Sequence, residues 1–296
     1  MAIKNQESLQ DIQTIKSQFE SLNYICSEEI ATAVYLAYHL EKPVLIEGPP
    51  GVGKTELAKT TADMLGLSCI RLQCYEGLDE SKAIYEWKYG KQLLYTQVLK
   101  ETLGEVLQGA KGLSESVKKL QSFGDIFFSE EFLEPRPLLK ALKEKDSCVL
   151  LIDEVDKSDH EFESLLLEIL SDFQLSIPEI GTVRAKKDKK PIVFLTSNNT
   201  REISDALKRR CLHLYIPFPE AQLERQIVQA RVPKISDQLN KQLVNFIQEL
   251  REMDLKKVPA ISETIDWAKT LILLHSETLD AELVRQTLNV ILKFQE

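Results

Sequence analysis

The chain has 296 residues, 43% of them hydrophobic, which is enough for one large domain or two of ordinary size with a sizeable core. Its formal net charge of −9 argues against non-specific attraction of the whole surface to nucleic acid or to an anionic membrane. No apolar run approaches the ~20 residues of a membrane span, and the polar first residues lack the apolar core of a signal peptide. We therefore expect a cytoplasmic protein with no membrane insertion.

The cysteines are scattered and include no C-x-x-C pair, and three of them lie in apolar stretches. This pattern is typical of small buried thiols in a reduced, intracellular protein rather than of a metal site. The five cysteines are Cys26, Cys69, Cys74, Cys148 and Cys211.

The N-terminal part of the chain alternates helix and strand signals. Residues 1–42 are mostly helical in pattern, and residues 43–48 form a short apolar run that ends in glycine, which predicts a buried strand. A glycine-rich loop follows. Residues 54–65 then predict a helix that Gly66 closes, and residues 68–74 are the next strand candidate.

Residues 78–145 show a weaker pattern, with helical stretches and a cluster of four aromatic residues, the first three of which we expect to serve packing more than binding. These aromatic residues are Tyr85, Trp87, Tyr89 and Tyr95.

Three apolar runs, at residues 148–153, 192–198 and 212–216, predict buried strands. A predicted helix at residues 160–173 separates the first two. This alternation predicts an α/β fold, a parallel sheet covered by helices on both faces as an αβα sandwich.

The strand signals stop at Pro217 and Pro219, which cannot continue a strand or helix through their own N–H. The following residues show only helical periodicity. We therefore expect two domains, an αβα domain over residues 1–217 and an all-helical domain over residues 218–296.

The glycine-rich loop matches the pattern G-x-x-x-x-G-K-[ST] and lies between a predicted strand and a predicted helix, as that pattern requires. Backbone N–H groups of such a loop converge on one point, and the helix adds its positive end. A polyphosphate is the expected guest, so the sequence predicts a P-loop NTPase that binds ATP or a similar nucleotide. The expected nucleotide-binding residues are Gly48, Pro49, Pro50, Gly51, Val52, Gly53, Lys54, Thr55 and Glu56.

Two adjacent carboxylates, Asp153 and Glu154, end the apolar strand at residues 148–153. We expect Asp153 and the Thr55 hydroxyl to hold Mg²⁺, and Glu154 to polarise the water that attacks the γ-phosphate. The strand at residues 192–198 also ends in polar residues. Asn198 is expected to bind that water or the γ-phosphate, and Asn199 is the alternative that spacing alone does not exclude.

The order of these features resembles the AAA+ ATPases and, within them, the MoxR group, including its CoxD-like members. The resemblance covers about residues 30–269 and includes runs outside the nucleotide motifs. Its stretches are "CYEGLDESKAIYEWKYGKQLL", "RPLLKAL", "LLIDEVDKSD", "TSNNTREISDALKRRCLHLYIPFP" and "ISETIDWA".

The resemblance implies specific roles. Residues 48–55 match the Walker A loop, Asp153 and Glu154 match Walker B, and Asn198 matches the sensor-1 asparagine. Arg210, or alternatively Arg209, matches the arginine finger that acts on the nucleotide of a neighbouring subunit. The family therefore implies a homo-oligomeric ring, usually a hexamer, although a charged helix end accounts for two arginines as well.

Two insertions also resemble the MoxR group, one in helix 2 over about residues 79–120 and a hairpin before sensor 1 over about residues 173–191. We expect the tip of that hairpin at residues 184–190, where five of seven residues are basic. The tip is either a solvated loop or a contact for an acidic partner.

One position departs from the family. Ser262 and Glu263 stand where most members carry a sensor-2 arginine, which leaves Lys269 or an unplaced residue to substitute. The departure puts closure of the helical domain in doubt, but not binding or hydrolysis.

The resemblance implies an ATP-hydrolysing chaperone that remodels or matures a client protein, often with a von Willebrand A-domain partner. CoxD-like members imply maturation of the metal centre of a molybdenum hydroxylase of the carbon monoxide dehydrogenase kind. The alternatives are a nucleotide-gated binding module with slow turnover and a nucleic-acid motor, which the net charge disfavours. The sequence leaves the client, the oligomer number and the choice of ATP over GTP open.

Overall fold

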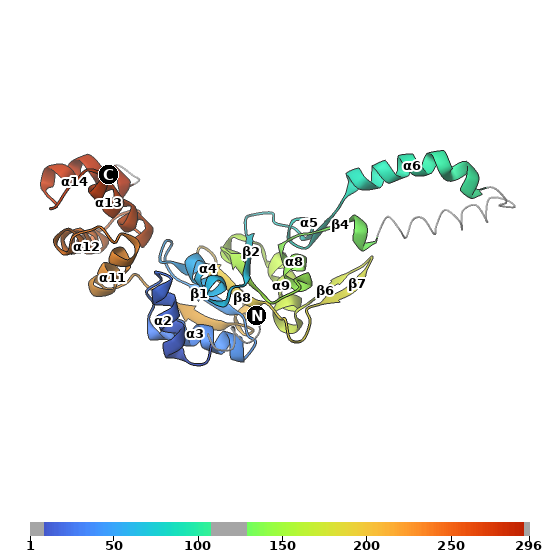
Figure 1. Cartoon of the computed structure of the whole chain (residues 1–296), viewed down its shortest axis with the longest axis horizontal. Coiled ribbons are helices and arrows are strands. Elements are labelled where there is room, and N and C mark those ends of the chain that lie inside the picture. The colour runs from blue at the N-terminus through green and yellow to red at the C-terminus, as the bar shows by residue number, and fades with distance from the viewer. Residues whose placement is uncertain (1–8, 108–128, 293–296) are drawn as a thin grey trace.

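The computed structural model describes residues 9–107 and 129–292, with backbone alone for residues 99–107. Its centre is a five-stranded parallel sheet in the order β2-β5-β8-β1-β9 (Figure 1). Val44 of β1 lies beside Phe194 of β8 on one side and Leu212 of β9 on the other. The strands are β1 (Val44–Glu47), β2 (Ser68–Gln73), β5 (Cys148–Asp153), β8 (Ile192–Ser197) and β9 (Leu212–Tyr215).

Helices cover both faces of this sheet because successive strand residues point to opposite sides. Leu151 of β5 packs in a core with α2 (Ile12–Ser21), α3 (Glu28–His39) and α4 (Lys54–Leu65). Its neighbour Leu150 packs in a second core on the other face. That core holds α8 (Pro137–Lys143), α9 (His160–Asp172) and α10 (Asp205–Lys208). The predicted αβα sandwich with a parallel sheet is confirmed.

Local sequence sets the ends of the helices that carry the site. Gly53 and Gly66 flank α4 with φ angles of 98° and 63°, in the left-handed region that favours glycine. The Asp159 carboxylate accepts the N–H of Phe162 at 2.8 Å and caps α9.

An insertion projects from the body beyond β2 (Figure 1). It comprises α5 (Glu80–Ala83), β3 (Tyr85–Trp87), α6 (Tyr89–Leu107), η1 (Glu130–Phe132) and β4 (Leu133–Pro135). Strands β3 and β4 pair antiparallel. The predicted insertion at about residues 79–120 begins here, and its part beyond residue 107 lies outside the described residues.

The four aromatic residues of this region divide into two groups. The rings of Tyr85 and Trp87 meet edge to face at 5.6 Å and pack against the core of the sheet. The Tyr95 ring packs on Phe132 at 5.1 Å, whereas Tyr89 is 66% exposed.

The expected tip of the second insertion was wrong. Strands β6 (Gln174–Ile177) and β7 (Gly181–Arg184) form the hairpin, so its tip is the turn at residues 178–180. Pro178 and Gly181, whose φ is 82°, place the turn before the basic stretch, which instead leads from β7 back to β8. Lys189 donates to the carbonyl of Lys145 at 2.5 Å, and Lys190 pairs with Glu41 at 2.5 Å. Two of the five basic side chains are therefore bound to the body of the protein.

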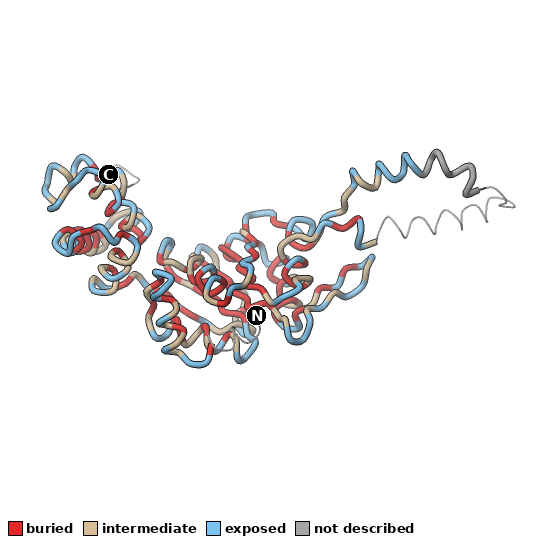
Figure 2. The backbone as a smooth tube through the Cα atoms, in the orientation of Figure 1, coloured by how far each residue is buried: buried red, intermediate tan, exposed pale blue. Residues whose placement is uncertain are grey.

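The described residues after β9 form helices with their own core, as Figures 1 and 2 show. The indole of Trp267 is fully buried there and donates to the Thr287 hydroxyl at 2.8 Å. Glu224 and Arg251 form a buried ion pair at 2.6 Å. The helices are α11 (Ala221–Arg231), α12 (Asp237–Glu252), α13 (Ile261–Leu273), α14 (Ala281–Thr287) and the short η3 (Leu288–Val290).

This helical C-terminal region is the one predicted from the sequence. Within residues 9–107 and 129–292, none of the helices combines the length and apolarity that a membrane span requires.

Candidate active site

The phosphate loop, residues 48–53, joins β1 to α4 at the carboxyl edge of the sheet. Gly48 runs so close to the residue that follows β9 that a Cβ atom there would lie 2.1 Å from the carbonyl oxygen of Ile216. Gly51 has a φ of 75°, and its Cβ would lie 2.4 Å from the Cβ of Ala260 in the helical region. Glycine is therefore required at both positions, by close backbone approach and by the left-handed conformation.

Lys54 is buried at the start of α4, with 6% of its surface exposed. Its ammonium donates to the carbonyls of Gly48 at 2.6 Å and Pro49 at 2.7 Å, and to Oδ1 of Asn198 at 2.8 Å. Burial lowers the pKa of Lys54 to about 8, against the opposing effect of nearby carboxylates. The side chain is thus a desolvated cation held inside the loop.

Asp153 lies beside this loop at the end of β5 and is 2% exposed. Its Oδ1 accepts the Thr55 hydroxyl at 3.0 Å and the Thr196 hydroxyl at 2.5 Å. The Thr55 oxygen and the buried carboxylate are hard oxygen ligands placed side by side, which is the donor set that Mg²⁺ takes together with phosphate oxygens and water. The residues present therefore fit a magnesium ion.

Glu154 follows directly and has a φ of 57°, in the left-handed region. Its N–H donates to the Thr196 hydroxyl at 2.8 Å. Its carboxylate accepts from Gln73 Nε2 at 2.8 Å, from Lys157 Nζ at 2.6 Å and from Asn198 Nδ2 at 3.3 Å. Three side chains from different elements thus orient this carboxylate.

The structure separates the two candidate asparagines. Asn198 contacts both Lys54 and Glu154 and lines the same pocket, whereas the Asn199 side chain accepts from the Ser197 hydroxyl at 3.3 Å in a turn. Asp156 holds this turn, because its Oδ2 accepts the N–H groups of Asn198 at 3.2 Å and Thr200 at 3.0 Å.

A pocket of about 260 Å³ brings these groups together. It contains Lys54, Thr55, Asp153, Glu154 and Asn198. Of the expected loop residues, Pro50, Gly51, Gly53 and Glu56 also line it.

The two arginines after α10 lie elsewhere, and neither lines this pocket of the same chain. Arg210 donates to the Ser171 hydroxyl at 2.5 Å and to the Ala206 carbonyl at 2.9 Å. The Arg209 side chain is exposed and makes no hydrogen bond or ion pair within the described residues.

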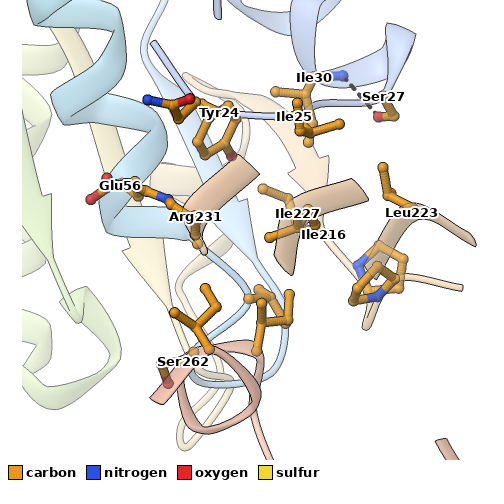
Figure 3. A pocket seen from close by; sticks show the side chains of 18 of the residues that line it. Tyr24, Ile25, Ser27, Ile30, Glu56, Ile216, Leu223, Ile227, Arg231 and Ser262 are labelled. Carbon is orange, nitrogen blue, oxygen red and sulfur yellow. Dashed lines mark hydrogen bonds and ion pairs between the residues drawn. The ribbon is translucent and has the colours of Figure 1, made fainter. Parts of the chain in front are cut away.

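An apolar pocket of about 320 Å³ adjoins the phosphate loop (Figure 3). It lies between the N-terminal segment, the loop and the first and third helices of the C-terminal region, with Glu56 and Arg231 on one side and Leu223 on the other. Glu56 of α4 and Arg231 of α11 form an ion pair beside this pocket. The apolar lining was not singled out from the sequence, where its isoleucines are indistinguishable from core residues: Ile25, Ile30, Ile216, Ile227, Ile261 and Ile265.

The region expected to carry a sensor-2 arginine serves other contacts. Ser262 lines both pockets, while the Glu263 carboxylate accepts the Ala260 N–H at 2.7 Å at the start of α13. Lys269 pairs with Asp266 at 3.4 Å on the surface and lines neither pocket. Lys269 is therefore badly placed to take the role of a sensor-2 arginine.

Sequence reasoning also missed two polar residues of β2. The Arg71 guanidinium donates to Oδ2 of Asp153 from Nε at 2.9 Å and from Nη2 at 2.6 Å, and it bonds to Gln73. An alternation of polar and apolar residues in the strand was the only local signal, and it does not reveal which strand lies alongside.

Solved structures with a similar arrangement include RuvB proteins of Thermotoga maritima. One RuvB mutant is 17% identical with a TM-score of 0.49, covering 89% of this chain and 68% of that chain. A second RuvB structure, described as a Holliday junction branch migration motor, is 18% identical with a TM-score of 0.46. The match covers 89% of this chain and 67% of that chain.

Two staphylococcal relatives cover most of the chain. A Staphylococcus epidermidis protein is 25% identical over 240 residues, 79% of this chain and 77% of the relative. A Staphylococcus haemolyticus protein is 24% identical over 255 residues, 84% and 83% of the two chains. Both are described only as uncharacterized proteins.

The model of one family, the AAA domain of the dynein-related subfamily, matches residues 43–211, from the first sheet strand to the paired arginines. This match spans more than half of the chain and includes the phosphate loop, the acidic pair and Asn198. The chain therefore belongs to the dynein-related subfamily of AAA domain proteins.

Proposed function

We propose that this protein is an ATPase whose catalytic groups are those of the 260 Å³ pocket. The observation that carries the proposal is the convergence of a buried lysine, a hydroxyl beside a buried carboxylate, a second carboxylate and an amide on one pocket. Structural needs alone rarely place such a set at the carboxyl edge of a parallel sheet.

In this proposal Lys54 holds the β- and γ-phosphates, exchanging its contacts with loop carbonyls for phosphate oxygens. Thr55 and Asp153 hold Mg²⁺, which neutralises phosphate charge when bound. Glu154 accepts the proton of the attacking water, and the Asn198 amide orients that water or the γ-phosphate.

The apolar pocket is proposed to hold the base. It adjoins the phosphate loop through Gly51, Val52 and Gly53, and it has the apolar lining that nucleotide bases favour. We propose ATP as the nucleotide, consistent with the family.

The test is nucleotide binding by Lys54→Ala. We expect the variant to unfold near the wild-type temperature without nucleotide but to gain no stability from Mg-ATP, because the cation that offsets phosphate repulsion is gone. Lys59→Ala, on the exposed side of the same helix, is the matched control and should respond to Mg-ATP as wild type does. Unchanged nucleotide affinity in Lys54→Ala would refute the assignment of the phosphate loop.

At the level of assembly we propose a homo-oligomeric ring of the MoxR type, hexameric as in most of that group, in the cytoplasm. The ring acts on a protein client, with a von Willebrand A-domain protein as partner, and a CoxD-like role would be maturation of the metal centre of a molybdenum hydroxylase. Residues 1–217 and 218–296 are proposed as its two domains. A pulldown with the Glu154→Gln variant and ATP tests this proposal by identifying the bound client.

A nucleotide-gated binding module is the second candidate. It is favoured by the position of Lys269, which lines neither pocket and leaves no described lysine or arginine of α13 in contact with the phosphate pocket. Steady-state turnover separates the candidates, since a module that uses hydrolysis as a timer turns over far less than once per second, below the usual range of enzymes.

A further inference from the structure

The carboxylate of Asp153 is shared between two sides of the site. Its Oδ1 faces the hydroxyls of Thr55 and Thr196, and its Oδ2 accepts both hydrogen bonds from the guanidinium of Arg71. The carboxylate is 3% exposed and the arginine 48%, so the pair joins a buried anion to a cation that reaches solvent.

The strand order of the sheet explains this contact. Strand β2 lies directly beside β5, and Gln73 is the register partner of Asp153. Arg71, two residues before Gln73, is on the same face of the strand, so its long side chain extends along the edge to the carboxylate. No other lysine or arginine in the described part of the chain forms an ion pair with Asp153.

The charges impose a competition. A buried carboxylate needs a positive partner, and Arg71 is that partner in this structure. Mg²⁺ bound at Thr55 and Asp153 would bring two further positive charges to the same carboxylate, and like charges this close oppose each other. Without metal, in turn, an unpaired Asp153 would repel the phosphates of a nucleotide.

We propose that Arg71 is a positioning residue that serves as the resident counter-cation of Asp153. It neutralises the carboxylate when metal is absent, and it weakens metal binding when metal arrives. Arg71 thereby makes nucleotide binding less dependent on Mg²⁺. This inference rests on the proposed nucleotide site and adds a regulatory residue to it.

The experiment measures the coupling between metal and nucleotide. The dissociation constant of ADP is determined by calorimetry in EDTA and in saturating Mg²⁺. The value in EDTA divided by the value in Mg²⁺ is the coupling factor. The dissociation constant of Mn²⁺ for the protein, measured with and without ADP by electron paramagnetic resonance, gives the corresponding coupling from the metal side, because linkage is reciprocal. We expect Arg71→Gln to raise the coupling factor by about fivefold or more. Without Arg71, the charge of Asp153 weakens ADP binding in EDTA, and Mg²⁺ binds without repulsion from the guanidinium, so both effects raise the ratio.

Three further variants complete the design. Arg71→Lys keeps the charge and should stay within about twofold of wild type, a rescue that a purely structural role of the planar guanidinium would not give. Arg136→Gln removes a comparably exposed, ion-paired arginine between β4 and α8 and should leave the coupling unchanged. Lys157→Gln removes a cation paired with Glu154 instead of Asp153, and should change the coupling less than Arg71→Gln does.

An unchanged or smaller coupling factor in Arg71→Gln, or an equal rise in Lys157→Gln, would overturn the inference. Thermal unfolding of each protein without ligand shows which variants are folded, and Arg71→Met, which also removes the charge, takes the place of Arg71→Gln if Arg71→Gln is not folded. A wild-type protein that binds no ADP in either condition would refute the proposed function instead, so the two failures are distinguishable.

Discussion

The acidic residues at the end of β5 differ sharply in their surroundings. Asp153 is buried and hydrogen-bonded to two hydroxyls, whereas Glu154 projects into the pocket from a left-handed backbone conformation. A residue with a Cβ atom adopts that conformation at a cost of about 1–2 kcal/mol. The hydrogen bond from the Glu154 N–H to Thr196 helps to offset it, and the result is a carboxylate directed toward Asn198.

Glu154→Gln should bind ATP and hydrolyse it at least about a hundredfold more slowly, because the amide has nearly the same shape but cannot accept the proton of water. Phosphate release under saturating ATP measures the rate, and thermal stabilisation by ATP confirms binding. Glu161→Gln, an exposed glutamate of α9, is the control and should retain wild-type turnover. Wild-type turnover in Glu154→Gln would show that water is activated by another group.

At the scale of elements, hydrogen bonds and an ion pair from buried carboxylates hold the segment after β8 in place. Asp156 accepts three hydrogen bonds from Asn198 and Thr200. Farther along, the buried carboxylate of Glu163 on α9 pairs with Arg201 at 2.5 Å and accepts the Ser204 N–H at 3.0 Å. Asn198 therefore belongs to a segment whose position depends on two buried carboxylates.

Glu163 gives this region a pH-dependent stability. Burial alone would raise the pKa of Glu163, but its bonds to Ser204 and Arg201 outweigh burial, and the pKa lies below its ordinary value of 4.5. The folded state thus favours the charged form, so the stabilisation is complete above pH 4.5 and is lost as the pH falls through the lowered pKa.

Glu163→Gln should therefore lower the free energy of unfolding at pH 7 by about 1–3 kcal/mol, because it leaves Arg201 without its charged partner. The difference from wild type should shrink below pH 4.5. Urea unfolding at pH 7 and pH 4 measures both values, with Glu161→Gln as the control. A difference that stays constant between the two pH values would contradict the lowered pKa.

Sequence patterns predicted the elements and residues whose signals are local. The phosphate loop, the acidic strand end and Asn198 are each defined by a few consecutive residues, and the structure brings them into one pocket. Arg71 and the apolar pocket escaped prediction because their role depends on which strands and helices become neighbours. The basic stretch was misplaced because charge does not fix a turn, whereas the Pro178 and Gly181 positions do.

At the scale of the whole molecule, the helical C-terminal region meets the sheet domain at the phosphate loop. Ile261 of α13 joins the core beside α4, Ala260 packs against Gly51, and Arg231 of α11 pairs with Glu56. Residues of both regions line the apolar pocket (Figure 3). Nucleotide binding is thus expected to fix the two regions relative to each other, which couples the pocket to the shape of any assembly.

The last prediction concerns that assembly and the paired arginines. Neither arginine lines the pocket of its own chain, so a catalytic role requires a neighbouring subunit. Arg209 is exposed and ready for such a contact, whereas Arg210 would first have to leave Ser171 and the Ala206 carbonyl. We expect Arg209→Ala to lose turnover on the order of 10³-fold while each subunit still binds ATP, and Arg210→Ala to lose less.

Mixing separates a role between subunits from one within a subunit. Inactive Arg209→Ala added to inactive Lys54→Ala should regain activity, because the first supplies an intact phosphate loop and the second an intact arginine. Lys208→Ala, whose side chain pairs with the exposed Glu202 and with no other carboxylate of residues 9–107 and 129–292, is the control and should turn over ATP as wild type does. The readouts are phosphate release and, by native mass spectrometry, the presence of mixed assemblies. The experiment is repeated with Arg210→Ala in place of Arg209→Ala. If mixed assemblies with Lys54→Ala form in both cases but never hydrolyse ATP, neither arginine contributes to the site of a neighbouring subunit.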